Sequence, residues 1–229
     1  MELLSCAILQ GNVLLLFITF PESNLRQHPS QAGYAEEAAR LVQDYESRTF
    51  EQTFASILDL FPASPCRSLD VGAGTGRHAA ALAKRNHEVT AVEPTRELRE
   101  AGQNLHNDVP LTWVNDTLPE LESLGHGPKI VQYDFILMAA VLMHFDERER
   151  KDIIRRMGEL LAPGGRFILS LRHGPIPQGR RMFSVSLDEI ITLAKQNGMH
   201  YVHHASCPDP SARPGVSWGM LCLDKPTDD

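Results

Sequence analysis

The stretch from Ser68 to Arg77 constrains the fold of this chain more than any other. It reads SLDVGAGTGR, a short apolar run that ends in three glycines and leads into an alanine-rich segment over 78–85. The apolar run predicts a strand and the alanine-rich segment predicts a helix. Glycines allow a tight turn and a close approach of a bound group, and the start of a helix offers free N–H groups. The sequence therefore predicts a nucleotide-type site at a strand-turn-helix junction.

The glycine spacing distinguishes between ligand classes. In the dinucleotide fingerprint G-x-G-x-x-G the third glycine stands one residue later, where this chain has Arg77. A pyrophosphate is therefore not the favoured ligand. The run from Asp70 to Gly76 instead resembles the first motif of class I S-adenosylmethionine-dependent methyltransferases, of the small-molecule type 11/12-like group. The resemblance extends over roughly 31–224. It implies cofactor contacts at Asp70, Gly72, Ala73, Gly74, Thr75, Gly76 and Arg77.

The remaining pattern predicts an α/β fold. Strands are expected within 67–71, 88–92, 111–114, 130–140, 166–171, 199–205 and 216–223, and helices over 78–85, 95–104, 146–161 and 186–197. The stretch Ala162–Gly165 is expected to be a helix-stopping turn. Together with the resemblance, this order predicts a Rossmann-like, doubly wound sheet of seven strands. The sheet should be mostly parallel with an antiparallel last strand, and helices should cover both faces.

The N-terminal part is predicted to add a cap to this core. Residues 1–29 form an apolar extension, 30–61 a helical cap and 62–229 the methyltransferase core, with cap and core as one domain. The run Val13–Phe20 is too short for a membrane span and lacks the positive flank of a secretory signal. We interpret the extension as a packed or dispensable segment, or as an apolar contact in a dimer.

Polar residues at the ends of later strands complete the predicted cofactor site. Glu93 ends the second strand, where a carboxylate can accept both hydroxyls of a ribose, although a solvated strand-end acid is the alternative. The resemblance implies that Asp116 accepts the adenine amino group, whereas an Asp in a loop is commonly a turn former. The full set of further cofactor candidates is Glu93, Pro94, Asn115, Asp116, Thr117, Met138 and Ala139.

The methyl acceptor is expected on the side of the loop Arg172–Phe183, which is rich in Pro, Gly and Arg. This loop leaves the carboxyl edge of the sheet, where open α/β folds bind ligands. Candidate substrate contacts are Tyr34, Tyr45, His144, Arg172, His173, Arg180 and Arg181. His144 is also a candidate general base, with a pocket-lining role as the alternative. Aromatic residues at helical spacing, such as these tyrosines, are more often core residues, and the arginines could lie on a mobile surface connection.

The composition narrows the range of functions that this chain can have. Lys and Arg number 22 against 29 Asp and Glu, a net charge of −7, which argues against a nucleic-acid partner. Four widely spaced cysteines suggest neither a zinc site nor disulfides, and no metal is required. We therefore expect a cytoplasmic monomer or homodimer, off the membrane, that uses S-adenosyl-L-methionine and releases S-adenosyl-L-homocysteine.

The expected acceptor is a small O, N, S or C nucleophile, with an anionic one as an option. Three alternatives remain open: a nicotinamide-dependent oxidoreductase, a tRNA or protein methyltransferase, and a non-catalytic S-adenosylmethionine-binding regulatory protein.

Overall fold

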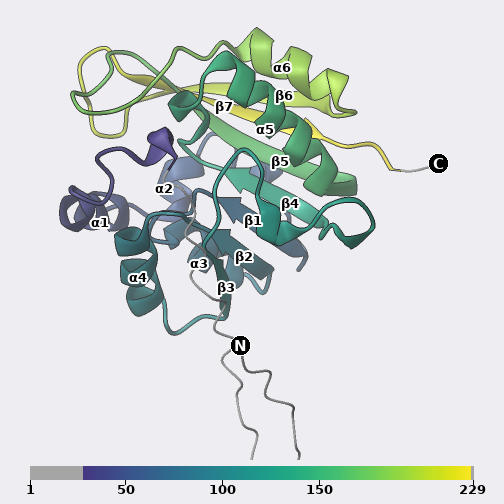
Figure 1. Ribbon diagram of the computed structural model, residues 1–229, viewed down its shortest axis with the longest axis horizontal. Coiled ribbons are helices and arrows are strands. Elements are labelled where there is room, and N and C mark those ends of the chain that lie inside the picture. Colours follow the sequence, from purple (N-terminus) through teal and green to yellow (C-terminus); the bar gives the residue numbers. More distant parts are fainter. Residues whose placement is uncertain (1–27, 228–229) are drawn as a thin grey trace, which may run out of the picture.

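A computed structural model describes residues 28–227 and contains one seven-stranded sheet of order β3-β2-β1-β4-β5-β7-β6 (Figure 1). The strands are β1 (Arg67–Val71), β2 (Glu88–Val92), β3 (Leu111–Val114), β4 (Tyr133–Met138), β5 (Leu161–His173), β6 (His200–Pro208) and β7 (Ser217–Asp224). Strands β1 to β5 pair in parallel, and β7 is antiparallel to both β5 and β6. The predicted fold class is confirmed. The predicted apolar extension falls almost wholly on residues 1–27, outside the described part.

Helices lie on both faces of this sheet. They are α1 (Ala38–Glu46), α2 (Phe50–Phe54), α3 (Arg77–Ala83), α4 (Arg96–Leu105), α5 (Glu147–Leu160) and α6 (Leu187–Gln196). Short 3₁₀ turns are η1 (Pro29–Gln31), η2 (Leu58–Leu60), η3 (Glu122–Leu124), η4 (Gly127–Lys129) and η5 (Leu142–His144). Within residues 28–227, none of the helices combines the length and apolarity needed to cross a membrane.

The alternation of side chains along each strand divides the core into two layers. Leu69 and Val71 of β1 face a cluster that includes Ile153 and Met157 of α5 and Ile190 of α6. The opposite face packs a second cluster, in which residues of β2, β4, β5 and β7 meet α2 and α3: Phe50, Phe54, Ala79, Leu82, Val89, Ala91, Phe135, Leu137, Ile168, Met220 and Cys222. A third, smaller cluster joins α1 to Leu98 of α4. The cap helices α1 and α2 are therefore packed onto the core.

Local sequence signals explain where α5 begins and ends. The Asp146 carboxylate accepts the backbone N–H of Glu149 at 3.0 Å, and the Glu149 carboxylate accepts the N–H of Asp146 at 2.7 Å. This capping box starts the helix at the predicted place. The helix ends at Leu160, as the signal at Ala162–Gly165 predicts, and β5 begins at Leu161 with an irregular stretch here, where Gly164 has a φ of +77° and the register against β4 shifts. Backbone bonds between Gly164 and Lys225 and between Lys225 and Gly165, both 2.9 Å, tie this stretch to the end of β7.

The strand order also fixes where a ligand site can form. Strand β1 connects to β2 on one side, whereas its other neighbour, β4, connects onward to β5. The loops after β1 and β4 therefore diverge and leave a crevice at the carboxyl ends of these two strands. The glycine turn that follows β1 lies at this crevice.

Candidate functional site

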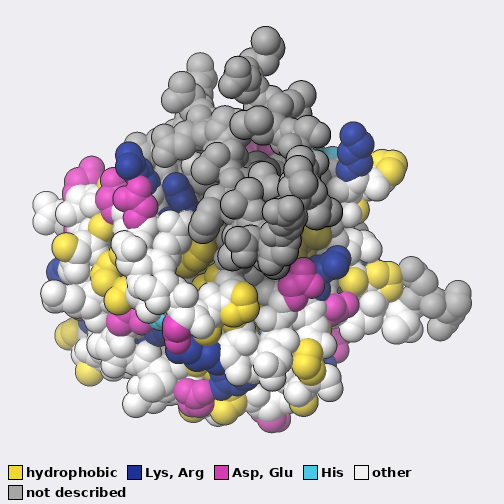
Figure 2. Space-filling model, turned by 90° about the horizontal axis from the view of Figure 1, so that it is seen from below, with side chains coloured by type: hydrophobic (Ala, Val, Ile, Leu, Met, Phe, Trp, Pro, Cys, Tyr) yellow, Lys and Arg dark blue, Asp and Glu magenta, His cyan; other side chains and the backbone are white. Residues whose placement is uncertain are grey.

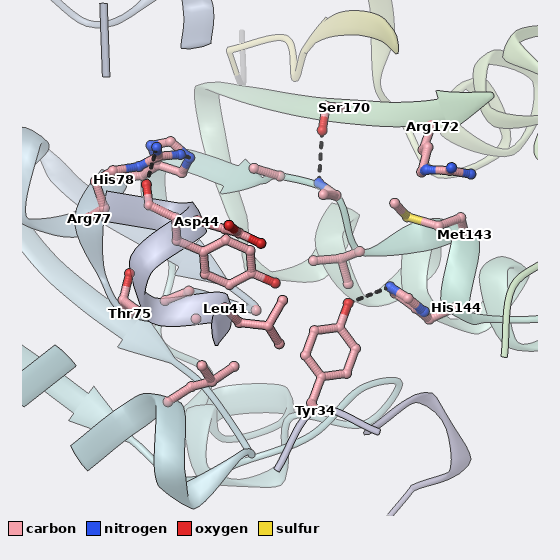
Figure 3. Close-up of a pocket in the computed structure, with 18 of the residues that line it drawn as sticks. Tyr34, Leu41, Asp44, Thr75, Arg77, His78, Met143, His144, Ser170 and Arg172 are labelled. Atoms are coloured by element: carbon pink, nitrogen blue, oxygen red, sulfur yellow. Dashed lines mark hydrogen bonds between the residues drawn. The ribbon is translucent and has the colours of Figure 1, made fainter. Parts of the chain in front are cut away.

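A cavity of about 980 Å³ lies at the carboxyl ends of the parallel strands (Figure 3). The glycine turn, the ends of β2 and β4 and the segment 139–145 line its inner side. The cap over 30–56 covers it, and the segments around 170–182 and 207–220 contribute the remaining wall. A volume of this size is at the upper end of the range for small-molecule sites.

The glycine turn requires glycine for different reasons at different positions. Gly72, Gly74 and Gly76 have φ values of +69°, +58° and +74°, which disfavour other residues. A Cβ on Gly72 would lie 2.6 Å from a methyl carbon of Val141, so this glycine brings the turn against the segment after β4. A Cβ on Gly76 would lie 2.6 Å from the Trp113 ring. Gly76 therefore allows the start of α3 to pack against Trp113 of β3, and it does not line the cavity.

Glu93 fixes the far side of the turn. Its side chain is 5% exposed, and its carboxylate accepts the backbone N–H groups of Gly74 and Thr95, each at 2.8 Å. Burial raises the pKa of this carboxyl, while the two N–H donors oppose the shift. One carboxylate thus holds the turn and still presents free lone pairs to the cavity, which Glu93 lines.

Asp70 lies behind the turn and does not line the cavity. It is 1% exposed, its Oδ2 has no hydrogen-bond partner in the described chain, and it accepts the backbone N–H of Ala79 in α3. Burial raises the pKa of this carboxyl to about 7, the nearby Glu93 carboxylate adds to the rise, and the Ala79 N–H and Arg77 oppose it. Asp70 therefore supports the strand-turn-helix junction from below.

The raised pKa of Asp70 predicts a pH-dependent stability. Between pH 3.8, the ordinary value, and about 7, the carboxyl is ionised in the unfolded chain but protonated in the folded one. Its contribution to the free energy of unfolding is therefore fully present below pH 3.8 and is lost as pH rises to about 7. Relative to Asp70→Asn, the free energy of unfolding of the wild type should fall by about 2–4 kcal/mol over this interval. Urea unfolding at pH 4 and pH 7.5 measures this difference, and equal pH slopes for both proteins would contradict it.

Asp116 shapes the loop after β3. It is 2% exposed, and its two oxygens accept the backbone N–H groups of Thr117 and Ser123, both at 2.7 Å. Asp116, Thr117 and Leu118 line the cavity. Asn115 does not, and its side-chain oxygen accepts from Arg99 at 3.3 Å. The loop therefore offers the cavity an acidic side chain that its own backbone already orients.

Arg77 ties the cap to the core. Its guanidinium donates to the backbone carbonyls of Tyr45 and Arg48, the latter at 2.9 Å, and reaches His78 Nε2 at 3.0 Å. Burial lowers the pKa of this group. Ten of the predicted cofactor residues line the cavity: Gly72, Ala73, Gly74, Thr75, Arg77, Glu93, Pro94, Asp116, Thr117 and Ala139. Asp70, Gly76, Asn115 and Met138 do not line it.

His144 and Tyr34 form a hydrogen-bonded pair on the cavity wall (Figure 3). His144 Nδ1 lies 2.9 Å from the Arg181 carbonyl oxygen, which can only accept, so Nδ1 carries the proton. Nε2 is then the acceptor for the Tyr34 hydroxyl at 2.9 Å. Burial chiefly lowers the pKa of His144, with Arg180, Arg172 and Arg181 adding to the effect. Burial also raises the pKa of Tyr34 to about 12, so both groups are neutral at pH 7.

Arg180 joins the loop after β5 to the cap. Its guanidinium carbon stacks 4.0 Å from the Tyr34 ring centre, and it pairs with Glu37 at 3.2 Å and donates to the Ala32 carbonyl at 3.0 Å. Tyr45 approaches the glycine turn, since a Cβ on Gly74 would lie 3.2 Å from its ring. Tyr34, Tyr45 and Arg180 all line the cavity, as do His144 and Arg172.

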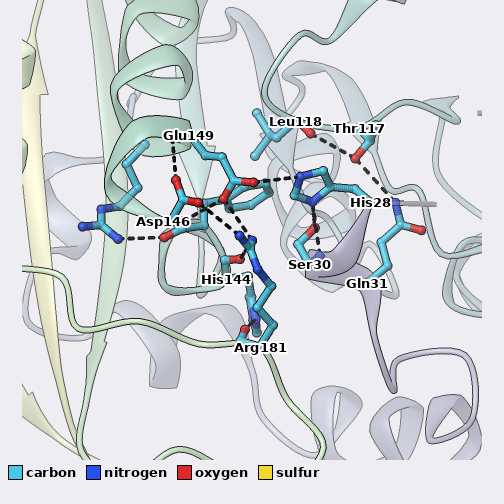
Figure 4. Close-up of polar contacts among 11 residues, drawn as sticks. His28, Ser30, Gln31, Thr117, Leu118, His144, Asp146, Glu149 and Arg181 are labelled. Atoms are coloured by element: carbon cyan, nitrogen blue, oxygen red, sulfur yellow. Dashed lines mark hydrogen bonds and ion pairs between the residues drawn. The ribbon is translucent and has the colours of Figure 1, made fainter. Parts of the chain in front are cut away.

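Two predicted substrate residues lie elsewhere. Arg181 pairs with Glu149 at 2.9 Å and Asp146 at 3.3 Å, in a network at the start of α5 that also includes His28 (Figure 4). His173 is exposed, and its Nε2 lies beside the position of a Cβ on Gly219. Neither residue lines the cavity. Arg181 therefore fixes the loop after β5 to the start of α5.

The hairpin between β6 and β7 contributes residues that the sequence pattern did not single out. Asp209 pairs with Arg213 at 2.7 Å and accepts the indole N–H of Trp218 at 2.9 Å, and Arg213 holds the pKa of Asp209 well below its usual range. Arg213 and Trp218 line the cavity, as does Ser170 of β5. Of these, only Ser170 had a signal in the sequence, as a polar residue inside an apolar strand.

Comparison with known sequences finds similarity to methyltransferases. Residues 69–167 match the family model described as a methyltransferase domain. The probable S-adenosyl-L-methionine-dependent methyltransferase TehB of Haemophilus influenzae is 26% identical over 178 residues, which cover 68% of this chain and 58% of that protein. An uncharacterized methyltransferase of Mycobacterium tuberculosis is 30% identical over 112 residues, 46% of this chain and 53% of that protein. The chain thus spans less than two thirds of the length of these relatives.

Solved structures show the same fold. Magnesium protoporphyrin IX methyltransferase from Synechocystis, with S-adenosylmethionine bound, aligns with a TM-score of 0.60 at 17% identity over 84% of both chains. The 1,6-didemethyltoxoflavin-N1-methyltransferase of Burkholderia thailandensis, with 1,6-didemethyltoxoflavin and S-adenosylhomocysteine bound, aligns with a TM-score of 0.60 at 23% identity. That alignment covers 88% of this chain and 92% of the other.

Proposed function

We propose that this chain, which carries the methyltransferase domain of the class I S-adenosylmethionine-dependent family, transfers a methyl group from S-adenosylmethionine to a small-molecule nucleophile. One observation carries the proposal. A glycine turn at the switch point of the sheet is fixed by the buried carboxylate of Glu93, and both line a cavity of about 980 Å³. The family match over 69–167 includes both the turn and this acid.

The lining residues suggest how the cofactor is held. Glu93 would accept the two ribose hydroxyls, because its carboxylate reaches the cavity and is already oriented by Gly74 and Thr95. The adenine would lie beside Asp116 and Thr117, and the methionine part along the turn and the backbone of Ala139. Asp70 and Gly76 would then act by supporting the turn.

Methyl transfer suits a site that aligns the two reactants. An O, N, S or C nucleophile attacks the methyl carbon in line with the C–S bond, the bond electrons pass to sulfur, and the positive sulfonium becomes a neutral thioether. Such a reaction gains chiefly from alignment and exclusion of water. The Nε2 lone pair of His144 accepts the Tyr34 hydroxyl, and it becomes free when this hydrogen bond breaks. His144 would then serve as the general base for an acceptor that must lose a proton.

A small and anionic acceptor fits the charges around the cavity. Arg172 is 7% exposed, donates to the carbonyls of Pro175 at 2.8 Å and Gly174 at 3.4 Å, and has no carboxylate in ion-pair contact among residues 28–227. Burial chiefly lowers the pKa of Arg172, and Arg213 adds to this. The nearby Asp209 carboxylate opposes this shift, but it pairs with Arg213, so an anionic group of the acceptor would still stabilise the Arg172 guanidinium.

This reasoning predicts the effect of Arg172→Ala. The variant should raise the acceptor KM about tenfold or more, because one charge-assisted contact is lost, while the dissociation constant for S-adenosylmethionine changes less than twofold. Steady-state kinetics and calorimetry measure the two quantities. Arg155→Ala is the matched control, since that arginine is exposed on α5. Equal losses for acceptor and cofactor would assign Arg172 to the cofactor instead.

The test of the proposed function starts with binding. Calorimetry should show that the protein binds S-adenosylmethionine and S-adenosylhomocysteine, and absence of both would contradict the proposal. Methyl-labelled S-adenosylmethionine is then incubated with a small-molecule extract, with tRNA and with total protein. Label in the small-molecule fraction is expected. Label only in tRNA or protein would favour a macromolecular acceptor, and binding without transfer would favour a regulatory protein.

Surface charge favours the small-molecule acceptor. In Figure 2, outside the part that grey atoms cover, basic and acidic side chains lie interspersed over the visible face. The net charge of −7 adds to this argument, because a nucleic-acid surface is normally basic. A cytoplasmic location and a monomeric or homodimeric state stay predictions.

A further inference from the structure

We propose that Ser170 is a positioning residue for the cofactor, because its hydroxyl holds Ala140 in a left-handed conformation that turns the Ala139 carbonyl toward the crevice between β1 and β4. The inference rests on the proposed function, since it assigns a role in binding the amino-acid end of S-adenosylmethionine. Ser170 lies in β5, two strands away from the glycine turn.

The backbone after β4 has an unusual conformation. Ala140 has a φ of +62°, a region that residues with a Cβ rarely adopt outside strained functional segments. Its N–H donates to Ser170 Oγ at 2.8 Å (Figure 3). Ser170 is 5% exposed, and both residues line the cavity. The hydroxyl is thus a buried, fixed acceptor that selects this conformation.

The direction of the Ala139 carbonyl follows from that hydrogen bond. The peptide bond between Ala139 and Ala140 is trans, so its C=O points opposite to its N–H. The N–H points to Ser170 on β5, and β5 and β1 flank β4 on opposite sides. The carbonyl therefore points toward β1, where Gly72 meets Val141. This is the crevice in which the glycine turn lies.

A carbonyl in that place suits an ammonium group. The amino-acid end of S-adenosylmethionine carries an α-ammonium, and a hydrogen bond from a charged donor is stronger than one between neutral groups. If the Ser170 hydroxyl is removed, Ala140 loses the contact that stabilises its positive φ, and the peptide can rotate toward an ordinary conformation. The cofactor must then restore the carbonyl direction on binding, which weakens its affinity.

The serine has no comparable use as a packing residue. Its neighbours on β5 are Leu169 and Leu171, both buried, and the strand would pack as well with alanine at 170. A buried hydroxyl is unfavourable unless it is hydrogen-bonded. The Ala140 N–H is the partner that the structure gives it.

The experiment compares two ligands that differ only at the amino-acid end. Calorimetry is performed with S-adenosylhomocysteine and with 5′-methylthioadenosine, which lacks the whole amino-acid end, both the α-ammonium and the α-carboxylate. We expect Ser170→Ala to bind S-adenosylhomocysteine about tenfold more weakly, which corresponds to about 1.4 kcal/mol, and 5′-methylthioadenosine within twofold of wild type. Ser68→Ala, a change at another fully buried serine of the sheet, is the matched control and should alter neither affinity.

A second substitution tests the backbone mechanism. Ala140→Gly removes the conformational penalty at positive φ, and the affinity of this single variant is the reference for the second step. In the Ala140→Gly background, Ser170→Ala should weaken the binding of S-adenosylhomocysteine less than threefold, because glycine does not depend on the hydroxyl for its conformation. Ser170→Cys replaces the alanine variant if circular dichroism shows that the latter does not fold, with the same ligand selectivity expected.

The outcomes are distinguishable from failure of the proposed function. If wild type binds no S-adenosylhomocysteine, the proposed function itself is wrong. If wild type binds but Ser170→Ala shows unchanged affinity, or loses both ligands equally, the positioning role is overturned. If Ser170→Ala still weakens S-adenosylhomocysteine binding tenfold in the Ala140→Gly background, the backbone mechanism is likewise overturned.

Discussion

Glu93→Ala is expected to weaken the binding of S-adenosylmethionine at least about a hundredfold, because charge-assisted hydrogen bonds to two ribose hydroxyls are lost together. The substitution also leaves the N–H groups of Gly74 and Thr95 without their partner, so the turn loses its fixed position. Calorimetry at pH 7.5 measures the affinity, and circular dichroism confirms that the variant is folded.

Two further variants serve as a control and as an intermediate case for Glu93→Ala. Glu88 begins the same strand, is exposed, and pairs only loosely with Arg67 at 3.8 Å, so Glu88→Ala should bind normally. Glu93→Gln keeps one oxygen acceptor and should fall between wild type and the alanine variant. If Glu93→Ala binds as well as Glu88→Ala, Glu93 is a structural strand-end acid and the ribose assignment is wrong.

His144→Ala is expected to lower kcat about 10²- to 10³-fold with an acceptor that must lose a proton, while cofactor affinity changes little. This expectation depends on which ring nitrogen of His144 carries the proton. Nδ1–H is fixed by the Arg181 carbonyl, so Nε2 is the basic atom that faces the Tyr34 hydroxyl. The kinetics use the acceptor that the labelled-methyl screen identifies, and His126→Ala, an exposed histidine before β4, is the control.

The pH profile separates a base from a packing residue. A base acts in its neutral form, and burial lowers the pKa of His144 below the ordinary 6.5. Activity should therefore be constant above pH 6.5 and fall only at lower pH, and this acidic limb should vanish in His144→Ala. Tyr34→Phe keeps the ring against Arg180 but releases Nε2, so the limb should persist and shift. An unchanged kcat and profile in His144→Ala would contradict the assignment.

Local pattern predicted most of the fold because the determining signals are short-range. The glycine turn, the capping box at Asp146 and the apolar runs of the strands each specify their own element within a few residues. Resemblance then supplied the seven-stranded, mostly parallel arrangement with an antiparallel last strand, which no local signal contains. The start of β5 at Leu161 was not predicted, because Ala162–Gly165 joins the strand through bonds to Lys225, far along the chain.

The site was less predictable because exposure to the cavity depends on tertiary contacts. Arg172 and His173 were grouped together from the sequence, but consecutive residues of a strand face opposite sides, so only Arg172 lines the cavity. Gly76 reads as a ligand glycine, yet the contact that requires it is the Trp113 ring. Arg213 and Trp218 had no motif, because the cavity reaches them only through the antiparallel hairpin.

Arg180 has a consequence for how ligands enter and leave. Its side chain is inserted into the cap, with Tyr34, Glu37 and the Ala32 carbonyl around it, so the cap and the loop after β5 are fastened to each other at this point. On the other side, the cap meets the β6–β7 hairpin through the exposed contact of Arg48 with Ser211. We expect the route of exchange to open between the cap and that hairpin. The loop after β5 is held from two sides, by the cap through Arg180 and by α5 through Arg181.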